Sequence, residues 1–245
     1  GMLYMQMPDY VEAKRAFTHF LTFKYQRSEK VESASKELKN CEFSIDAMAN
    51  PKPFDFKNMG EGVNSEWEEY LPSVSADGKL FVITRRGPYQ NGIVSEDFFQ
   101  SVYKDGKWSM AQNLGPSVNT MGNEGAQCLS PNGKVLFFTA CDRKDGLGRC
   151  DIYISVKRNG QWSEARNIGP SINTKHWESQ PTISPDGREL YFVSNRPGGY
   201  GGMDIWKSVL TEKGTFSEPV NLGSSINTSY DEMSPFIHTD NQTLY

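Results

Sequence analysis

The chain has 245 residues, of which 37% are hydrophobic and 23% charged, the balance of an ordinary soluble globular protein. Its formal net charge of -4 argues against a nucleic-acid-binding surface, which needs a concentrated basic stripe. No apolar run approaches the roughly 20 residues of a membrane span, no signal-peptide pattern is present, and Gly1 ahead of Met2 looks like a residue left by tag cleavage.

The first segment, residues 1–50, predicts a pair of α-helices. In "YVEAKRAFTHFLTFKY" (10–25) the apolar residues recur at helical spacing, and Pro8-Asp9 supplies a helix start. A second helix is expected over roughly 28–48, and the sequence "NPKP" from Asn50 ends it. The pair looks like the last unit of a tetratricopeptide array, whose apolar face needs a neighbour to cover it.

Residues 51–245 have a different character, and they begin with a single expected strand. Asn58-Met59-Gly60 and Val63-Asn64 match Asn113-Leu114-Gly115 and Val118-Asn119 further along the chain. Residues 54–58, "FDFKN", therefore resemble an outermost strand with no inner strands before it. We expect this segment to close a ring of sheets by adding a strand to the last one.

The rest of the chain is a repeat with a period of 54 or 55 residues. Glutamates, turn residues and large aromatics all recur at this interval, and self-similarity at a fixed period indicates a repeat architecture. The repeats divide the chain into units 69–123, 124–177 and 178–231, followed by a partial unit 232–245. The recurring residues are Glu69, Glu124, Glu178 and Glu232; Asp77, Asn132, Asp186 and Asp240; and Trp108, Trp162 and Phe216.

Each repeat predicts four short β-strands. In the first, "YLPSVS" (70–75) alternates weakly and leads into a tight turn at Ala76-Asp77-Gly78. "KLFVITR" (79–85) and "DFFQSVY" (97–103) are rich in β-branched and aromatic residues, and the turn Asp105-Gly106 joins the second of them to the strand with Trp108. Four strands per unit of this length are typical of a β-propeller blade. Three complete blades do not close a ring, so we expect the natural protein to continue.

The chain resembles a known family in several motifs that stand in the same order. "EEYLPSVSADGKLFVITRR", "NLGPSVNT", "SPNGKVLFFTACDRKDGLGRCDIY" and "SPDGRELYFVSNRPGGYGGMDIW" look like the OmpA-family envelope proteins of Bacteroidetes-type bacteria. The resemblance implies tetratricopeptide repeats followed by a WD40-like propeller, in the periplasm at the outer membrane. A carboxypeptidase-regulatory-like module and an OmpA-like peptidoglycan-binding domain usually follow, and neither is in this chain. Some relatives belong to the type IX secretion machinery.

Two cysteines are expected to face each other in the second blade. Cys141 ends its second strand and Cys150 begins its third, so a hairpin across residues 142–149 places them within disulfide reach. The matching positions in the first blade, Arg86 and Glu96, could form a salt bridge at the same place. The oxidising compartment implied by the resemblance favours a disulfide, although adjacency alone leaves oxidation open. Cys41 and Cys128 are expected to be buried free thiols.

No motif for catalysis or metal binding stands out. The glutamates and aspartates recur in every blade, whereas an active site occupies one place, so we expect them to accept structural hydrogen bonds. The turns lack the remaining features of a sialidase Asp-box, no G-x-S-x-G or H-E-x-x-H motif occurs, and "DRKDGLGRCD" (142–151) departs from the EF-hand pattern. The three histidines, His19, His176 and His238, are too scattered for a metal centre. We expect no enzymatic activity and no cofactor.

The long loops offer the expected binding surface. In a four-stranded meander, the two tight turns lie at one face and the second-to-third loop and the crossover to the next blade lie at the other. Long loops on a rigid scaffold commonly carry recognition residues, and Tyr, Trp and Arg are favoured at contacts. The candidate partner-binding residues are Tyr89, Arg143, Arg149, His176, Trp177, Arg196, Tyr200 and Tyr230.

These observations predict a non-enzymatic protein-interaction scaffold of the bacterial envelope. Its partners would be other envelope proteins, and it would reach peptidoglycan only through a domain outside this chain. The alternative is a glycan-binding propeller or one associated with a peptidase or lyase. A glycan-binding propeller would place exposed aromatic residues around one pocket. The residues that would form this pocket are Tyr89, Trp177, Tyr200 and Tyr230.

Overall fold

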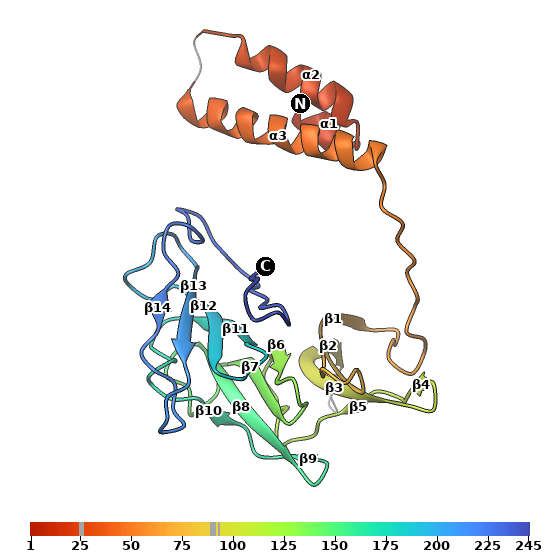
Figure 1. Ribbon diagram of the computed structural model, residues 1–245, viewed down its shortest axis with the longest axis vertical. Helices are drawn as coiled ribbons and strands as arrows, with labels where there is room; N and C mark the ends of the chain where they lie inside the picture. Colours follow the sequence, from red (N-terminus) through yellow and green to blue (C-terminus); the bar gives the residue numbers. More distant parts are fainter. Residues whose placement is uncertain (25–26, 89–91, 93) are drawn as a thin grey trace. The chain divides into compact units, whose positions relative to one another are not determined.

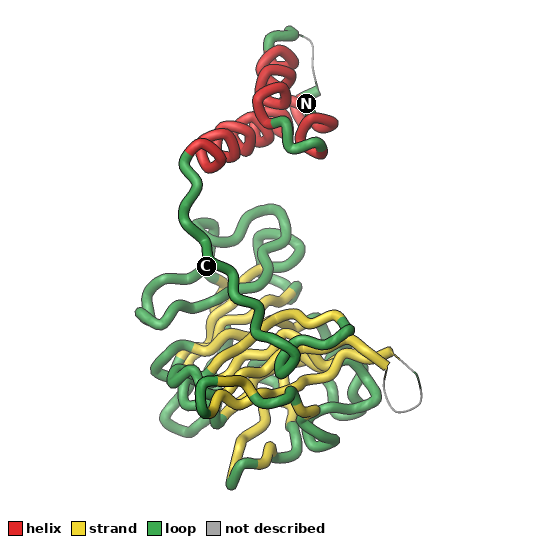
Figure 2. Tube along the Cα trace, turned by 90° about the vertical axis from the view of Figure 1, so that its right-hand side faces the viewer, coloured by secondary structure: helices red, strands yellow, loops and turns green. Residues whose placement is uncertain are grey.

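The computed structural model describes residues 1–24, 27–88, 92 and 94–245 of the chain. It divides into two compact units, Gly1–Asn58 and Met59–Tyr245. Figures 1 and 2 show that the first is helical and the second is built of strands and loops.

The first unit contains the two expected helices, α2 (Tyr10–Leu21) and α3 (Ser28–Ala49), and a short additional helix, α1 (Met2–Gln6). Helix α2 starts where the sequence predicts, because the side chain of Asp9 accepts a hydrogen bond from the Glu12 amide at 3.2 Å. The helices bury a small apolar cluster whose small residues let them approach closely: Ala13, Phe17, Ala34 and Cys41.

The expected closing strand at residues 54–58 is not formed. This segment has no regular secondary structure, and Phe54 and Phe56 are 72% and 83% exposed. A strand is stable only when a neighbouring strand pairs with its backbone. The last repeat, 232–245, offers a single isolated bridge between Ile237 and Leu244 and no strand edge to pair with.

The second unit contains three antiparallel sheets, one for each complete repeat, arranged side by side in chain order (Figure 1). The described residues form an arc of blades and no closed ring. Within each sheet the strands follow one another as a meander. The strands are β1 (Glu68–Val74), β2 (Leu80–Pro88), β3 (Val94–Lys104), β4 (Lys107–Trp108) and β5 (Gln112–Asn113); β6 (Glu124–Leu129), β7 (Val135–Cys141), β8 (Cys150–Arg158), β9 (Gln161–Trp162) and β10 (Arg166–Asn167); β11 (Glu178–Ile183), β12 (Glu189–Ser194), β13 (Asp204–Val209) and β14 (Val220–Asn221).

The expected fourth strand of each blade is broken into short pieces. In the second blade, β9 and β10 both pair with β8, and the chain leaves the ladder between them. The serine after the recurring aromatic causes the break, because Ser163 Oγ accepts a hydrogen bond from the Val156 amide at 3.1 Å. The backbone carbonyl of Ser163 accepts a hydrogen bond from Ser155 Oγ at 2.7 Å. Ser109 and Ser217 make the same contacts in their blades.

The first strand of each blade contains a β-bulge. Between Tyr70 and Ser73 the register with β2 shifts by one residue, and equivalent shifts occur in β6 and β11. A non-glycine residue at each bulge adopts a left-handed backbone conformation, with φ between +50° and +57°, as it does in the partial fourth repeat. These residues are Leu71, Ala126, Gln180 and Ser234.

The tight turn between the first two strands is built by the Ser-Pro-Asp-Gly sequence itself. In the third blade, Ser184 Oγ donates to Asp186 Oδ1 at 2.5 Å and accepts from the Glu189 amide at 2.8 Å. Asp186 also accepts from the Arg188 amide, and Gly187 has a φ of +73° that few other residues adopt. The turn is thus stabilised largely by hydrogen bonds among its own residues.

The apolar core lies between neighbouring sheets. One cluster joins the first and second blades through Val82, Phe98, Leu136 and Phe138. Another joins the second and third blades and includes Phe137 and Phe192.

Candidate interaction surface

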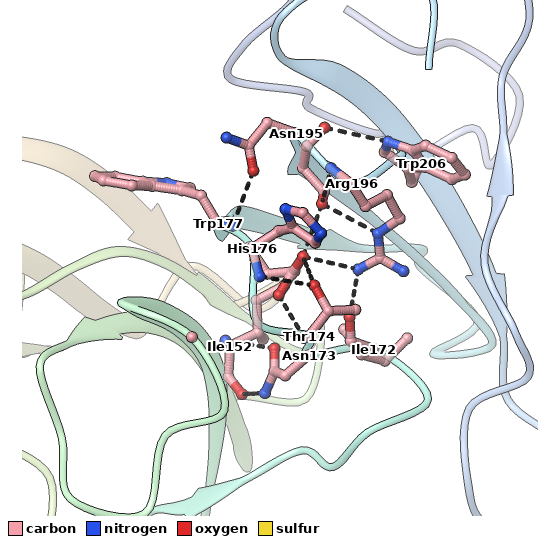
Figure 3. A network of polar contacts seen from close by, with 12 residues as sticks. Ile152, Ile172, Asn173, Thr174, His176, Trp177, Asn195, Arg196 and Trp206 are labelled. Atoms are coloured by element: carbon pink, nitrogen blue, oxygen red, sulfur yellow. Dashed lines mark hydrogen bonds and ion pairs between the residues drawn. The ribbon is translucent and has the colours of Figure 1, made fainter. Parts of the chain in front are cut away.

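A buried ion pair ties the crossover between the second and third blades to the blade that it enters. Glu178 is fully buried at the start of β11 and accepts hydrogen bonds from the amide and the hydroxyl of Thr174, at 2.6 and 2.9 Å. Its carboxylate also pairs with Arg196 at 3.1 Å, and Ser194 Oγ donates to it at 2.7 Å. The Arg196 guanidinium donates to the Ile172 carbonyl as well, within the network drawn in Figure 3.

The network recurs in the first and second repeats, and its threonine contacts recur in the fourth, without an arginine among the described residues. Glu124 accepts from the Thr120 amide and hydroxyl and pairs with Arg143 at 2.9 Å. Glu69 accepts a hydrogen bond from the Ser65 amide and forms an ion pair with Arg85 at 2.8 Å. Glu232 accepts hydrogen bonds from the Thr228 amide and hydroxyl. The recurring glutamates therefore have the structural role expected of them, although they bind the crossover and the following loop.

The asparagine that ends each crossover motif also has a structural role. Asn173 Oδ1 accepts a hydrogen bond from the Ile152 amide at 2.8 Å, and its Nδ2 donates to the Ile152 carbonyl at the same distance. Asn119 and Asn227 bind Phe98 and Ile205 in the same way. Each side chain takes the place of a missing outer strand at one residue of the ladder.

The recurring aspartates lie in the third strands, and those of the second and third blades shape the loops before them. Asp151 accepts from the Leu147 amide at 2.5 Å, and Asp204 accepts from the Tyr200 amide at 2.7 Å. Burial raises the pKa of the Asp151 carboxyl. Burial and the nearby charge of Glu124 raise the pKa of Asp97 to about 6.

A disulfide joins Cys141 and Cys150 in the structure, where β7 and β8 place them directly opposite each other. In the first blade, Arg86 and Glu96 are opposite each other too, but they form no ion pair. Arg86 instead pairs with Glu68 at 3.2 Å, and Glu96 accepts from the Tyr70 hydroxyl at 2.6 Å. Cys41 is buried, Cys128 is half-buried, and both are free thiols.

Two of the expected partner-binding residues lie inside the structure. The side chains of Arg143 and Arg196 are only 11% and 10% exposed, because each guanidinium is held by a buried glutamate. Arg196 also lies over the rings of Phe192 and Trp206. Both arginines are therefore removed from the candidate surface.

The other candidates fall into two groups of adjoining loops. The loop before β13 contacts the crossover after β14: the Gly202 amide donates to the Tyr230 carbonyl at 3.2 Å. Tyr200 and Tyr230, which these two segments carry, are 55% and 68% exposed. One blade earlier, Cys150 forms a bridge with Trp177, which brings the exposed Arg149 close to the half-buried His176 and Trp177. Tyr89 lies outside the described residues.

A cavity of about 630 Å³ between the second and third blades was not among the sequence-based candidates. Its walls are largely apolar and include Ile154, Leu210 and Phe216. The signal in the sequence is a substitution in the repeat, since Phe216 stands where Trp108 and Trp162 stand in the other copies.

Comparison with known proteins identifies the fold. No family model and no curated protein matches the chain. Among solved structures, TolB from Acinetobacter baumannii superposes with a TM-score of 0.50 at 20% identity, over 74% of this chain and 37% of that one. The chain shares its fold with TolB, a β-propeller protein. It spans little more than a third of that protein's length.

Two further β-propeller structures are similar at lower scores. A TolB-type protein of Agrobacterium tumefaciens has a TM-score of 0.48 at 18% identity, covering 74% of this chain and 59% of that one. The β-propeller domain of the trilobed protease from Pyrococcus furiosus has a TM-score of 0.43 at 13% identity, covering 66% of this chain and 45% of that one. Over the described residues, no helix is long and apolar enough to cross a membrane, and no three His, Cys, Asp or Glu side chains converge as a metal site would require.

Proposed function

We propose that this protein is a non-enzymatic scaffold that binds other proteins of the bacterial envelope through its long loops. The observation that carries the proposal is the pair of exposed tyrosines, Tyr200 and Tyr230, on adjoining loops of a rigid blade. Tyrosine supplies a large contact area at low entropic cost and is enriched at interfaces. The recurring carboxylates, in contrast, are engaged in structural hydrogen bonds.

The sequence motifs and the TolB-like fold support an envelope setting for this scaffold. The resemblance to OmpA-family proteins suggests a periplasmic location at the outer membrane, and the helix pair α2–α3 fits the end of a tetratricopeptide array. On this view peptidoglycan is bound by a domain outside the chain, and the blades and helices bind proteins.

Site-specific crosslinking in cells tests the proposal. A photo-reactive phenylalanine analogue is placed at Tyr200 or Tyr230 of the protein, and, as controls, at the exposed Met110 or Lys213. We expect the first two positions to capture defined envelope proteins that the controls do not. Tyr200→Ala and Tyr230→Ala should each reduce recovery of these partners in pulldowns by about tenfold, as for a contact hot spot.

The alternative function is glycan binding, which the same exposed tyrosines would favour because aromatic rings stack on sugars. Capture of no protein at these positions, together with retention on peptidoglycan fragments that Tyr200→Ala abolishes, would support that alternative. Equal capture at all four positions would show that the surface is wrongly assigned.

A further inference from the structure

The interface between the first and second blades is closed by three residues. The Lys157 ammonium donates to Gln100 Oε1 at 3.0 Å, and the Trp162 indole donates to the same oxygen at 3.1 Å. Trp162 is only 7% exposed and belongs to the core cluster between these blades. A large aromatic ring with a bound polar tip thus fills the space beside the outer strands.

The interface between the second and third blades has the same geometry with different residues. Lys157 pairs with Trp162 in the register of β8 and β9, and Leu210 forms the equivalent bridge with Phe216. Gln100 lies three residues after the recurring aspartate of its blade, as Ile154 does in the next. The polar side chains of Gln100 and Lys157 are therefore replaced by Ile154 and Leu210. The Trp162 indole is replaced by the smaller ring of Phe216.

This replacement coincides with the cavity described above. Seven apolar side chains line it apart from the turn prolines, and the tight turns of the two blades, at Pro131 and Pro185–Gly187, contribute to its edge. Its volume of about 630 Å³ falls within the roughly 300–1,000 Å³ of small-molecule sites. The seven side chains are Val135, Phe137, Ile154, Ile168, Ile183, Leu210 and Phe216.

The charged groups that line the cavity are Arg166 and Asp186. Arg166 lies on β10 opposite Ile154, is exposed, and forms no ion pair with any residue that the structure describes. Asp186 is already engaged by Ser184 Oγ and the Arg188 amide in its own turn. Among the described residues that line the cavity, Arg166 is thus the cation available to pair with a ligand.

We propose that this cavity binds a small amphipathic anion, whose apolar body lies between the second and third blades and whose carboxylate or similar group pairs with Arg166. The buried apolar body of the ligand makes dispersion contacts that Phe216, being smaller than a tryptophan, does not make. A carboxylate can form two parallel hydrogen bonds with the planar guanidinium of Arg166. This site is separate from the long-loop surface, so it stands whether or not the scaffold function does.

The test is a titration of the full chain, with carbon-13-labelled isoleucine and leucine methyl groups, followed by NMR. Octanoate is the probe, and 1-octanol is its uncharged counterpart with the same apolar chain. We expect octanoate to shift the methyl signals of Ile154, Ile168 and Ile183 and to leave Leu114, at the other interface, unchanged. Octanol should bind about fivefold more weakly, the contribution of one exposed ion pair.

Two variants and a control locate the site. Phe216→Trp introduces the larger ring found at the first interface and should weaken octanoate binding by narrowing the cavity. Arg166→Gln, at an exposed residue that does not endanger folding, should lower octanoate affinity about fivefold to that of octanol. Arg158→Gln, at an exposed arginine that does not line the cavity, should change nothing.

The proposal is overturned if octanoate leaves these methyl signals unmoved. It is equally overturned if octanoate and octanol bind alike, or if Arg166→Gln and Arg158→Gln have the same effect. An unchanged octanoate affinity in a folded Phe216→Trp variant would place the probe elsewhere.

Discussion

At the scale of single residues, buried carboxylates hold the crossovers in place. Glu178 has lost all contact with solvent, which costs several kcal/mol for an isolated charge. Arg196, Ser194 and Thr174 offset this cost by hydrogen bonds to its two oxygens. Such a group is stabilising only while all of its partners remain, because the arginine is almost as deeply buried.

We therefore expect Glu178→Gln to lower the free energy of unfolding by about 3 kcal/mol, since it leaves the Arg196 charge unpaired. Glu232→Gln is the matched control: Glu232 binds its threonine in the same way but has no arginine partner among the described residues, and it should cost about 1 kcal/mol or less. Urea titrations followed by tryptophan fluorescence measure both, because all five tryptophans lie in the blade unit. Equal losses in the two variants would contradict the role assigned to the ion pair.

At the scale of elements, the loops between the second and third strands are shaped by glycines and aspartates. A Cβ atom on Gly148 would lie 2.2 Å from the His176 carbonyl oxygen, and one on Gly201 would lie 1.9 Å from that of Tyr230. Each loop therefore packs its backbone directly on the following crossover. In the second blade the disulfide between Cys141 and Cys150 closes the same loop covalently.

Removing this disulfide should destabilise the blade unit. The double variant Cys141→Ser, Cys150→Ser is expected to lose about 2–3 kcal/mol, the loop-closure contribution of a bridge between residues nine apart. Urea titrations with and without dithiothreitol measure it: reductant should weaken the original chain by the same amount and leave the variant unchanged. A reductant effect that persists in the variant would assign the loss to something other than this bond.

At the scale of the whole molecule, a helical unit and a blade unit are joined through a segment without secondary structure. Residues 51–58 carry two exposed phenylalanines and no strand. Chain segments with few contacts open readily and are the preferred sites of proteolysis. Inside the blade unit, by contrast, each crossover is held by its glutamate network.

Brief treatment with chymotrypsin should therefore cut first after Phe54 or Phe56 and release an intact blade unit. The variant Phe54→Ser, Phe56→Ser should release this fragment about tenfold more slowly, because the preferred cleavage sites are gone. Mass spectrometry of the fragments measures both. First cuts within residues 69–231 would show that the blades open more easily than the connecting segment.

Much of this fold could be predicted because each copy of the repeat contains the same short-range sequence features. The serine-to-aspartate turn, the helix start at Asp9 and the opposition of Cys141 and Cys150 depend on neighbours in the sequence. The burial of Arg143 and Arg196 depends on glutamates 18 or 19 residues earlier in the chain, which strand pairing brings beside them, so an arginine in a long loop was expected to be exposed. The missing strand at 54–58 depends on whether a partner edge exists, which composition does not reveal.

The bulge in the first strand of each blade has a consequence for recognising such chains. One extra residue at Leu71, Ala126 or Gln180 reverses which side of the sheet the following side chains occupy. A strand of this kind keeps a buried face while its sequence changes phase in the middle, as "YLPSVS" does. Methods that score strands by alternating hydrophobicity will therefore overlook the innermost strand of these blades. A template with a one-residue phase change after the recurring glutamate would detect it.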